Sequence, residues 1–418
     1  MLQQWFKDAK LGISLHWGIY AVLGIPESWS FHNGQISYED YIKQCEKFTA
    51  SNYDPKHWAE VFRKAGAKYV VLTSKHHDGV ALWDTQYSDL NVVKRTPAGK
   101  DLIGPYCETM RNEGLKVGLY FSHLDWSNQD YVAYTEATAE VRQTPEYQAM
   151  WDHFLQFHRG QLQELTSRYG TIDMFTFDGD WDHPAEVWKM KELRDMLHKA
   201  NPNIVLNSRM RGYGDFETPE QGMPVIPYED QYWEFWFTTN DSWGIQYQDQ
   251  NYKTLKQIIW MFCDCIGLGG NVLWNVAPYE DGTLDPKQEE LLLSFGEWIT
   301  PVQEAVYGTT AGLPFGHYAY PSTLSKDKQT LYLFYPDIPQ EAIPVKGIYN
   351  KIRRIEVLKS GKELSSKVIG GAPWLHVPGV LWIDLKPEDT DPNMTVIKIE
   401  LDGPLQLYRG AGQAISVN

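Results

Sequence analysis

The sequence has little cysteine and no long apolar run, and both shortages narrow the class of protein. Only four of the 418 residues are cysteine, and Cys263 and Cys265 stand one residue apart. That spacing suits neither a zinc knuckle nor a redox Cys-x-x-Cys pair. We therefore expect four reduced, buried thiols, as is usual in a cytoplasmic protein. No stretch reaches ~18 uninterrupted apolar residues, which argues against a membrane-spanning helix.

Positive charge is also scarce. Lys and Arg number 38 against 54 Asp and Glu, which gives a net charge of −16. Nucleic acids and anionic membranes both require basic patches, so we expect neither as a partner. The first residues, "MLQQWFKDAKLG", contain no apolar signal-peptide core, so a cytoplasmic location is expected, although a chain trimmed of its leader would look the same. The sequence does not fix the oligomeric state and is compatible with a homo-oligomer.

Aromatic residues are abundant, with 17 Trp and 25 Tyr. Such a composition indicates either a large aromatic core or a sugar-binding protein, in which aromatic faces stack on pyranose rings. The hydrophobic fraction of 43% is sufficient for a large packed core and excludes extensive disorder.

The first three quarters of the chain alternate between apolar strands and amphipathic helices. Strands are predicted at 11–18, 68–79, 115–126, 172–181, 203–209 and 270–278, and helices at 52–67, 102–114, 145–170, 184–200, 252–265 and 286–302. Continuous apolar strands in repeated βα units indicate a parallel sheet. A doubly wound sheet usually carries a glycine-rich first turn, which is missing here, so we predict a (β/α)₈-like (TIM-type) barrel.

From about residue 309 the pattern changes to short strands separated by Gly, Pro, Asp and Ser turns. Helical periodicity disappears, which is typical of an antiparallel β-sandwich. We therefore predict two domains, a catalytic (β/α)₈-like barrel over 1–308 and a C-terminal β-sandwich over 309–418. Residues 127–145 and 210–250 are expected to form loops around the ligand.

Polar residues gather where the predicted barrel strands end. These strand ends carry His16-Trp17, Lys75-His76-His77-Asp78, His123-Leu124-Asp125-Trp126, Asp178-Gly179-Asp180-Trp181, Arg209 and Trp274-Asn275. The chemistry of a parallel barrel lies at the carboxyl ends of its strands. Polar groups beside aromatic rings at one rim indicate a pocket for a polyhydroxylated ligand.

Asp178 follows a buried strand directly, and three roles are open to it. It could attack an anomeric carbon as a nucleophile. It could bind a metal with Asp180 and the histidines. It could cap the helix that starts near Pro184, a role better suited to Asp182. Adjacent His76 and His77 would point to opposite faces of a strand, which weakens the metal hypothesis. The alternative to a binding role for these two histidines is a strand-end turn satisfied by backbone groups.

A glycosidase also needs a second carboxyl group to protonate the departing oxygen. The candidates in the segment 212–244 are Glu217, Glu220, Glu229 and Glu234. Glu220 follows a proline and Glu234 follows a tryptophan, and an apolar neighbour that excludes water would raise the pKa of either. Spacing alone does not choose between them.

Seven segments together resemble, in order, the signature segments of the α-L-fucosidases of glycoside hydrolase family 29. They are "KLGISLHWGIYAV", "YVVLTSKHHDGVALWDT", "VGLYFSHLDWS", "FDGDW", "DFETPEQ", "WEFWFTTNDSWG" and "GGNVLWNVAPYEDGTL". The resemblance spans about residues 5 to 300, and the C-terminal third looks like the β-sandwich that commonly follows. It implies a retaining exo-glycosidase that releases terminal α-L-fucose from oligosaccharides or glycoconjugates through a covalent intermediate, without a cofactor or metal.

The resemblance also implies roles for individual residues. Asp178 matches the nucleophile of the "FDG" segment. Glu220 of the "TPE" segment matches the general acid/base, with Glu234 as second choice. The sugar-binding residues that carry over by position are His16, Glu27, Trp29, His76, His77 and Arg209.

Three features depart from the family pattern, and the first is that Glu27 and Trp29 in "PESWS" are not adjacent as in the usual "EW" order. Relatives often have a Trp two residues before the nucleophile, where this chain has Thr176, so one aromatic contact to the sugar is in doubt. His123 replaces a small residue and is expected either to reach the aglycone or to lie in solvent. Two other functions stay open: a non-catalytic sugar-binding protein on this scaffold, and a related glycosidase such as an α-L-galactosidase.

Overall fold

A parallel sheet forms the centre of the protein. The structure, a computed structural model, describes residues 2–226, 228 and 230–410. The sheet consists of β1 (Leu11–Leu15), β2 (Tyr69–Lys75), β3 (Lys116–Ser122), β4 (Met174–Asp178), β5 (Val205–Leu206), β6 (Glu234–Thr238) and β7 (Asn271–Val276). Its order is β5-β4-β3-β2-β1-β7-β6, and every neighbouring pair is parallel. The predicted barrel-type α/β fold is thus confirmed.

An irregular segment, 215–221, lies between the two edge strands. Isolated parallel bridges join Asn207 to Phe216, Glu217 to Trp233 and Glu220 to Trp236. The backbone N–H of Asp215 donates to the Leu206 carbonyl oxygen at 2.7 Å, and the backbone N–H of Trp236 donates to the Pro219 carbonyl oxygen at 2.9 Å. The segment therefore connects β5 to β6 and closes the ring, and it carries Glu220 to the inside of the barrel mouth.

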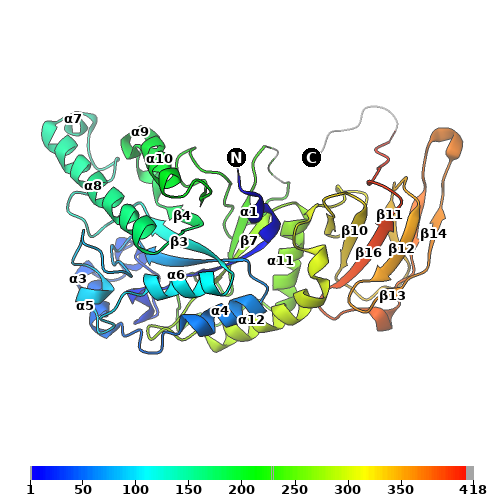
Figure 1. Cartoon of the computed structure of the whole chain (residues 1–418), viewed down its shortest axis with the longest axis horizontal. Coiled ribbons are helices and arrows are strands. Elements are labelled where there is room, and N and C mark those ends of the chain that lie inside the picture. Colours follow the sequence, from blue (N-terminus) through cyan, green and yellow to red (C-terminus); the bar gives the residue numbers. More distant parts are fainter. Residues whose placement is uncertain (1, 227, 229, 411–418) are drawn as a thin grey trace.

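Helices cover the outside of the sheet (Figure 1). Those before β4 are α1 (Gln4–Ala9), α2 (Trp29–His32), α3 (Tyr38–Ile42), α4 (Pro55–Lys64), α5 (Val92–Arg95), α6 (Ile103–Asn112), α7 (Ala139–Arg142) and α8 (Pro145–Arg168). Those after it are α9 (Ala185–Trp188), α10 (Met190–Ala200), α11 (Leu255–Gly267) and α12 (Pro286–Ile299). The predicted start of α4 is confirmed, because the Asp54 side chain accepts hydrogen bonds from two backbone N–H groups and Pro55 fills the first position.

The helix predicted over 184–200 is in fact two helices. Lys189 has a left-handed φ of 52° and separates α9 from α10, and the half-buried Arg159 of α8 donates to the carbonyl oxygens of Trp188 and Lys189 at this break. Asp182 does not cap α9 and instead accepts a hydrogen bond from the Tyr131 hydroxyl.

One predicted strand was too long and another strand was missed. The strand expected over 203–209 is only Val205–Leu206 long. The reason is that the Asn207 side chain replaces the backbone hydrogen bonds that would continue the strand. It pairs with both the N–H and the C=O of Phe177, at 2.8 and 2.9 Å. The other error concerns β6, which lies inside the loop predicted over 210–250 and is buried along its whole length.

The C-terminal part contains two antiparallel sheets. Their strands are β8 (Thr310–Ala311), β9 (Ser322–Leu324), β10 (Thr330–Tyr335), β11 (Ile343–Lys346), β12 (Ile352–Val357), β13 (Lys362–Glu363), β14 (Ser366–Ile369), β15 (Val380–Ile383) and β16 (Thr395–Leu401). One sheet has the order β13-β12-β16-β10-β9-β8 and the other β11-β15-β14, with an apolar core of their own. Figure 1 shows this part beside α11 and α12, where Trp298 donates to the Met394 carbonyl at 3.0 Å. The domain boundary at 308/309 stays a prediction.

The four cysteines are free and buried, as predicted from their number and spacing. Within the described part of the chain, no helix combines the length and the apolar character that crossing a membrane requires.

Candidate active site

A cavity of about 250 Å³ opens at the carboxyl ends of the parallel strands. Seven of the predicted site residues line it: His16, Glu27, Trp29, His76, Asp178, Arg209 and Glu220. His77 adjoins it, with its Nε2 atom 3.6 Å from Asp178 Oδ2. Glu234 is the predicted residue that the structure places elsewhere. The strand ends therefore bring together residues separated by up to 204 positions in the sequence, from His16 to Glu220.

Asp178 is the last residue of β4, and three donors fix its carboxylate. The Tyr120 hydroxyl donates to Oδ2 at 2.8 Å, the backbone N–H of Gly179 donates to Oδ1 at 2.9 Å, and the Arg209 guanidinium also donates to Oδ1. Gly179 has a φ of 81°, a left-handed conformation that glycine adopts without steric cost. A side chain there would also collide with Leu124. The turn after β4 thus holds the carboxylate at the cavity.

The charge on Asp178 is stabilised despite its surroundings. Burial alone would raise the pKa of Asp178, but the positive charge of Arg209 and the hydrogen bonds from Tyr120 and Arg209 outweigh burial and lower the pKa below its ordinary value. A buried carboxylate kept ionised beside a sugar-sized cavity has the properties of a nucleophile.

Arg209 links Asp178 to Glu220. One terminal nitrogen of its guanidinium contacts Asp178 Oδ1 and the other contacts Glu220 Oε2. Burial would lower the pKa of Arg209, but the two carboxylates raise it above its ordinary value. The Asp178 side chain is 15% exposed and the Glu220 side chain 35%. One planar group therefore holds a deep carboxylate and a second one closer to the opening.

The three predicted histidines lie together and are neutral. Burial lowers the pKa of His16 to about 3 and that of His77 to about 4, with the Asp178 charge opposing the shift in both. Burial, followed by repulsion from the other two histidines, lowers the pKa of His76 well below its ordinary value. The rings of His16 and His76 are 5.1 Å apart and those of His76 and His77 4.3 Å. Neutral imidazoles can both donate and accept, which suits sugar hydroxyls.

The tautomer of His77 follows from its neighbours. The Ser122 hydroxyl donates its only hydrogen to the Leu124 carbonyl at 2.7 Å, so Nδ1 of His77, 2.5 Å from Ser122 Oγ, must carry a hydrogen. In a neutral ring the Nε2 atom then has only a lone pair. That atom is buried and has no hydrogen-bond partner among the described residues, so it is available to accept a hydrogen from a ligand hydroxyl.

Glu27 and Trp29 occupy one wall of the cavity. Glu27 is buried, which raises its pKa, and the backbone N–H of Gly244 donates to its Oε1 atom. The Trp29 ring lies 5.7 Å from the ring of His77 and 6.4 Å from that of Trp181, which is 44% exposed at the rim. This wall combines an aromatic surface with a polar group that can meet ligand hydroxyls.

Glu234 lies deeper in the barrel than Glu220, two residues before Trp236, the β6 residue that bridges to Glu220. It is the first residue of β6, pairs with Asn271 at the start of β7 and is fully buried. Its carboxyl oxygens accept hydrogen bonds from the Tyr69 hydroxyl and, at 2.6 Å, from the Trp236 indole. It therefore holds the Trp236 side chain in place and does not reach the cavity. The centroid of the Trp236 ring lies 5.1 Å from the central carbon of the Arg209 guanidinium.

Glu234→Gln is expected to change how stability depends on pH. Burial raises the pKa of Glu234 from 4.5 to about 7. Between those values the folded protein binds more protons at this site than the unfolded chain, so the contribution of Glu234 to stability falls as the pH rises. Glutamine does not titrate. The free energy of unfolding of the variant minus that of the wild type should therefore increase between pH 4.5 and 7 and level off above it, as measured by urea denaturation. A difference independent of pH would contradict this assignment.

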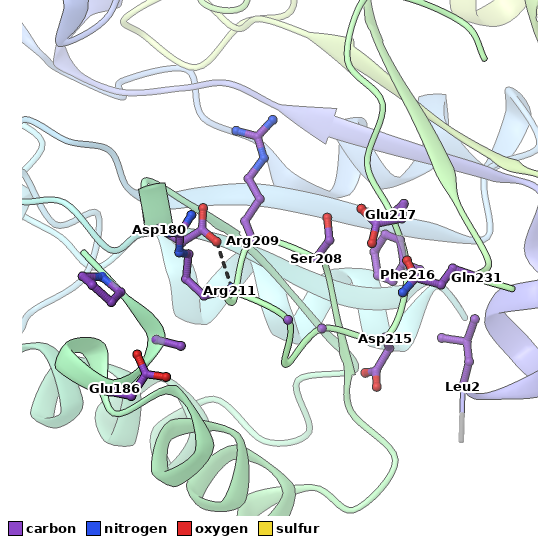
Figure 2. Close-up of a pocket in the computed structure, with 14 residues that line it drawn as sticks. Leu2, Asp180, Glu186, Ser208, Arg209, Arg211, Asp215, Phe216, Glu217 and Gln231 are labelled. Atoms are coloured by element: carbon purple, nitrogen blue, oxygen red, sulfur yellow. Dashed lines mark hydrogen bonds between the residues drawn. The ribbon is translucent and has the colours of Figure 1, made fainter. Parts of the chain in front are cut away.

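The sequence offered two other candidate carboxylates, Glu217 and Glu229. Glu229 lies outside the residues that the structure describes. Glu217 lines a second hollow of about 900 Å³ beside the cavity (Figure 2). There Asp180 accepts a hydrogen bond from the backbone N–H of Arg211 at 2.9 Å. Arg209 is common to the linings of both hollows, and Figure 2 shows its side chain extending away from Arg211 and Asp215.

His123 fits neither role expected for it. It is fully buried, with Nδ1 3.0 Å from His158 Nε2 and Nε2 3.0 Å from the Arg209 carbonyl oxygen. It thus positions the backbone of Arg209 rather than contacting the aglycone or solvent. The described residues also contain no group of three His, Cys, Asp or Glu side chains with the arrangement needed to hold a metal ion.

Several cavity residues escaped the sequence analysis. Tyr120, Trp236 and Trp243 line the cavity, but nothing in the local sequence distinguishes them from core aromatic residues. Tyr120 had one available signal, because it lies two residues before the end of β3 and so faces the barrel interior with Ser122. Trp243 lies in a loop and could be placed only by the fold.

Comparison with known proteins identifies the family of the chain. The family model described as alpha-L-fucosidase matches residues 1–304. Among curated proteins, the chain is 28% identical over 344 residues to the alpha-L-fucosidase of Dictyostelium discoideum, covering 74% of this chain and 72% of that one. It is 29% identical over 338 residues to the tissue alpha-L-fucosidase of Rattus norvegicus, covering 74% and 70%.

The solved structures agree. The alpha-L-fucosidase isoenzyme 1 from Paenibacillus thiaminolyticus is 33% identical, with a TM-score of 0.86 over 96% of this chain and 98% of that one. An alpha-L-fucosidase from Bacteroides thetaiotaomicron, crystallised as a trapped covalent intermediate with 2-fluoro-fucosyl fluoride, is 26% identical, with a TM-score of 0.84 over 96% of each chain. Both cover the C-terminal sheets as well as the barrel.

Proposed function

The chain belongs to the α-L-fucosidase family of glycoside hydrolases, and from this premise we propose that it is a retaining exo-α-L-fucosidase. It removes terminal α-L-fucose from oligosaccharides or glycoconjugates through a covalent fucosyl-enzyme intermediate. The observation that carries this proposal is the pair of carboxylates held by one guanidinium at the cavity, Asp178 and Glu220. The trapped covalent intermediate of the Bacteroides relative supports it.

The arrangement of the two carboxylates favours retention of configuration. Retaining glycosidases hold their two carboxyl groups ~5–5.5 Å apart, whereas inverting enzymes need a wider gap for a water molecule. The two oxygens accept hydrogen bonds from the two terminal nitrogens of one guanidinium, which keeps them within one guanidinium width and two hydrogen-bond lengths of each other. This spacing is compatible with the retaining pair.

The reaction then proceeds in two steps. Asp178, kept ionised by Arg209 and Tyr120, attacks the anomeric carbon while Glu220 gives its proton to the departing oxygen. Glu220, now a carboxylate, takes a proton from a water molecule whose oxygen attacks the same carbon. The bond between this carbon and Asp178 breaks, which frees the Asp178 carboxylate and releases fucose. Since Asp178 supplies the nucleophile and Glu220 performs both proton transfers, the proposed mechanism calls on no cofactor or metal.

The neutral histidines and Glu27 bind the sugar in this proposal. His16, His76 and His77 supply donors and acceptors on one side of the cavity, and the free Nε2 of His77 accepts a hydrogen from a sugar hydroxyl. Trp29 covers part of the ring. A buried group left unpaired by a sugar lacking the matching hydroxyl penalises that sugar, so this set confers specificity.

The location and partners of the enzyme are also proposals. Four free, buried cysteines favour a reducing compartment such as the cytoplasm. The net charge of −16 favours a neutral glycan over nucleic acid or an anionic membrane.

The stereochemistry of the first product tests the proposal. With 4-nitrophenyl α-L-fucoside as substrate, proton NMR recorded during the first turnovers should show α-L-fucose, which mutarotation later converts to the equilibrium mixture. Two displacements at the anomeric carbon require this outcome. Initial appearance of the β-anomer would refute the retaining mechanism but leave the fucosidase activity intact.

A further inference from the structure

The cavity extends below the proposed nucleophile into the barrel. Thr176 lies two residues before Asp178 on β4, so it faces the same side, ~6–7 Å deeper. Five residues that line this deeper part are defined here as the cavity floor: Ser14, Val71, Thr176, Trp236 and Leu273. They come from five different strands and are all at least nine-tenths buried. None of the five carries a charge.

The floor nevertheless contains two hydroxyl groups. Thr176 is 2% exposed, and its Oγ1 atom has no hydrogen-bond partner among the described residues. Ser14 donates its hydrogen to Asn275 Oδ1 at 2.9 Å, which leaves the lone pairs of its oxygen able to accept. By contrast, Thr73, which lines the same cavity, is satisfied by donating to the Leu15 carbonyl at 2.9 Å. The unpaired hydroxyl is therefore a particular feature of the floor.

The distribution of polar groups orients a bound fucose. The histidines and Glu27, which can pair with the hydroxyls on C2, C3 and C4, lie above the floor at the strand ends. The C5 substituent is the one part of fucose without a hydroxyl, so it belongs against Val71, Trp236 and Leu273. A methyl group there fits the apolar residues of the floor but leaves the Thr176 hydroxyl unpaired, which is unfavourable for a buried polar group.

L-Galactose differs from L-fucose by one hydroxyl, carried on C6 in place of a hydrogen of the methyl group. We propose that the site also hydrolyses terminal α-L-galactosides, with Thr176 Oγ1 hydrogen-bonded to the C6 hydroxyl and Ser14 as a second acceptor. This inference rests on the proposed function, because it uses the same two carboxylates. The bond between C1 and the aglycone oxygen breaks, water supplies the hydroxyl that appears on C1, and the remaining proton goes to the departing oxygen.

The test compares 4-nitrophenyl α-L-galactoside with 4-nitrophenyl α-L-fucoside on the wild type and on Thr176→Val. Valine keeps the shape of threonine and removes the hydroxyl. The wild type should hydrolyse both glycosides. In the variant, the ratio of kcat/KM for the galactoside to kcat/KM for the fucoside should fall about tenfold, the usual effect of one lost hydrogen bond. The ratio cancels any change common to both substrates, such as partial misfolding.

Thr323→Val is the matched control. Thr323 is a buried threonine of β9 in the C-terminal sheets, where it donates to the Ala305 carbonyl at 2.6 Å, and its replacement should leave the ratio as in the wild type. Hydrolysis of the fucoside without the galactoside, or a ratio that Thr176→Val does not lower, would overturn this inference while leaving the proposed function standing. Failure of the wild type to hydrolyse either glycoside would overturn both.

Discussion

Asp178→Ala is expected to lower kcat/KM for an aryl α-L-fucoside by ~10⁴-fold or more, the order of loss seen when a catalytic nucleophile is removed. The reason lies in the contacts of the Asp178 side chain. The Asp178 carboxylate is kept ionised by Arg209 and Tyr120 in the sugar cavity, and no other carboxylate of the cavity lining is held by both of these groups. The loss should appear in kcat, because the sugar-binding residues remain.

Azide should restore turnover of this variant with an activated substrate. Removing the side chain leaves space beside the anomeric carbon, and a small anion can occupy it and attack in place of the carboxylate. The product should be β-fucosyl azide, formed by a single displacement. Asp182→Ala is a suitable control from the same turn, since Asp182 binds Tyr131 outside the cavity. A normal rate for Asp178→Ala would exclude Asp178 as the nucleophile.

Glu220→Ala is expected to have the second largest effect, and the effect should depend on the leaving group. For fucosides with poor leaving groups, loss of the general acid should lower kcat/KM by ~10²–10⁴-fold. For a 2,4-dinitrophenyl fucoside or fucosyl fluoride, whose leaving groups need no proton, the first step should change little. A plot of log kcat/KM against leaving-group pKa should therefore become steeper in the variant.

Two further variants serve as comparisons for Glu220→Ala. Glu217 lies three residues away but lines the second hollow, so Glu217→Ala should retain the wild-type slope. Glu234→Ala should lower stability, since it leaves Tyr69 and Trp236 without their partner, and it should also keep the slope. A steep slope for Glu234→Ala with a normal slope for Glu220→Ala would reverse the assignment made here.

Local signals in the sequence were enough to predict most of the barrel. The Asp54-Pro55 start of α4 is the clearest case, because an N-cap and a proline act within one turn. The strand β6 was missed because its sequence, "EFWFT", begins with a charged residue whose buried environment depends on Tyr69, 165 residues away. The segment 215–221 was missed because only isolated bridges to β5 and β6 hold it in place.

The same contrast applies to the site. Asp178, His16 and Arg209 could be predicted because each stands near the end of a strand, where a parallel barrel collects its functional groups. The same rule failed for Lys75 and Asp125, which also stand at strand ends but form a buried ion pair with each other at 2.9 Å. The hydroxyl of Thr176 could be noticed in the sequence, but its lack of a partner depends on the packing of the whole barrel.

The most direct test of the account is the site of covalent attachment. The Glu220→Gln variant, incubated with 2-fluoro-fucosyl fluoride, should accumulate a 2-fluoro-fucosyl ester, since the fluorine slows both steps and fluoride leaves without a proton. After proteolysis, mass spectrometry should find the added sugar on the peptide that contains "FTFDGDW", with fragment ions placing it on Asp178. A sugar attached to Asp180 or to another peptide, or a protein that turns over the reagent without ever carrying it, would contradict the central claim.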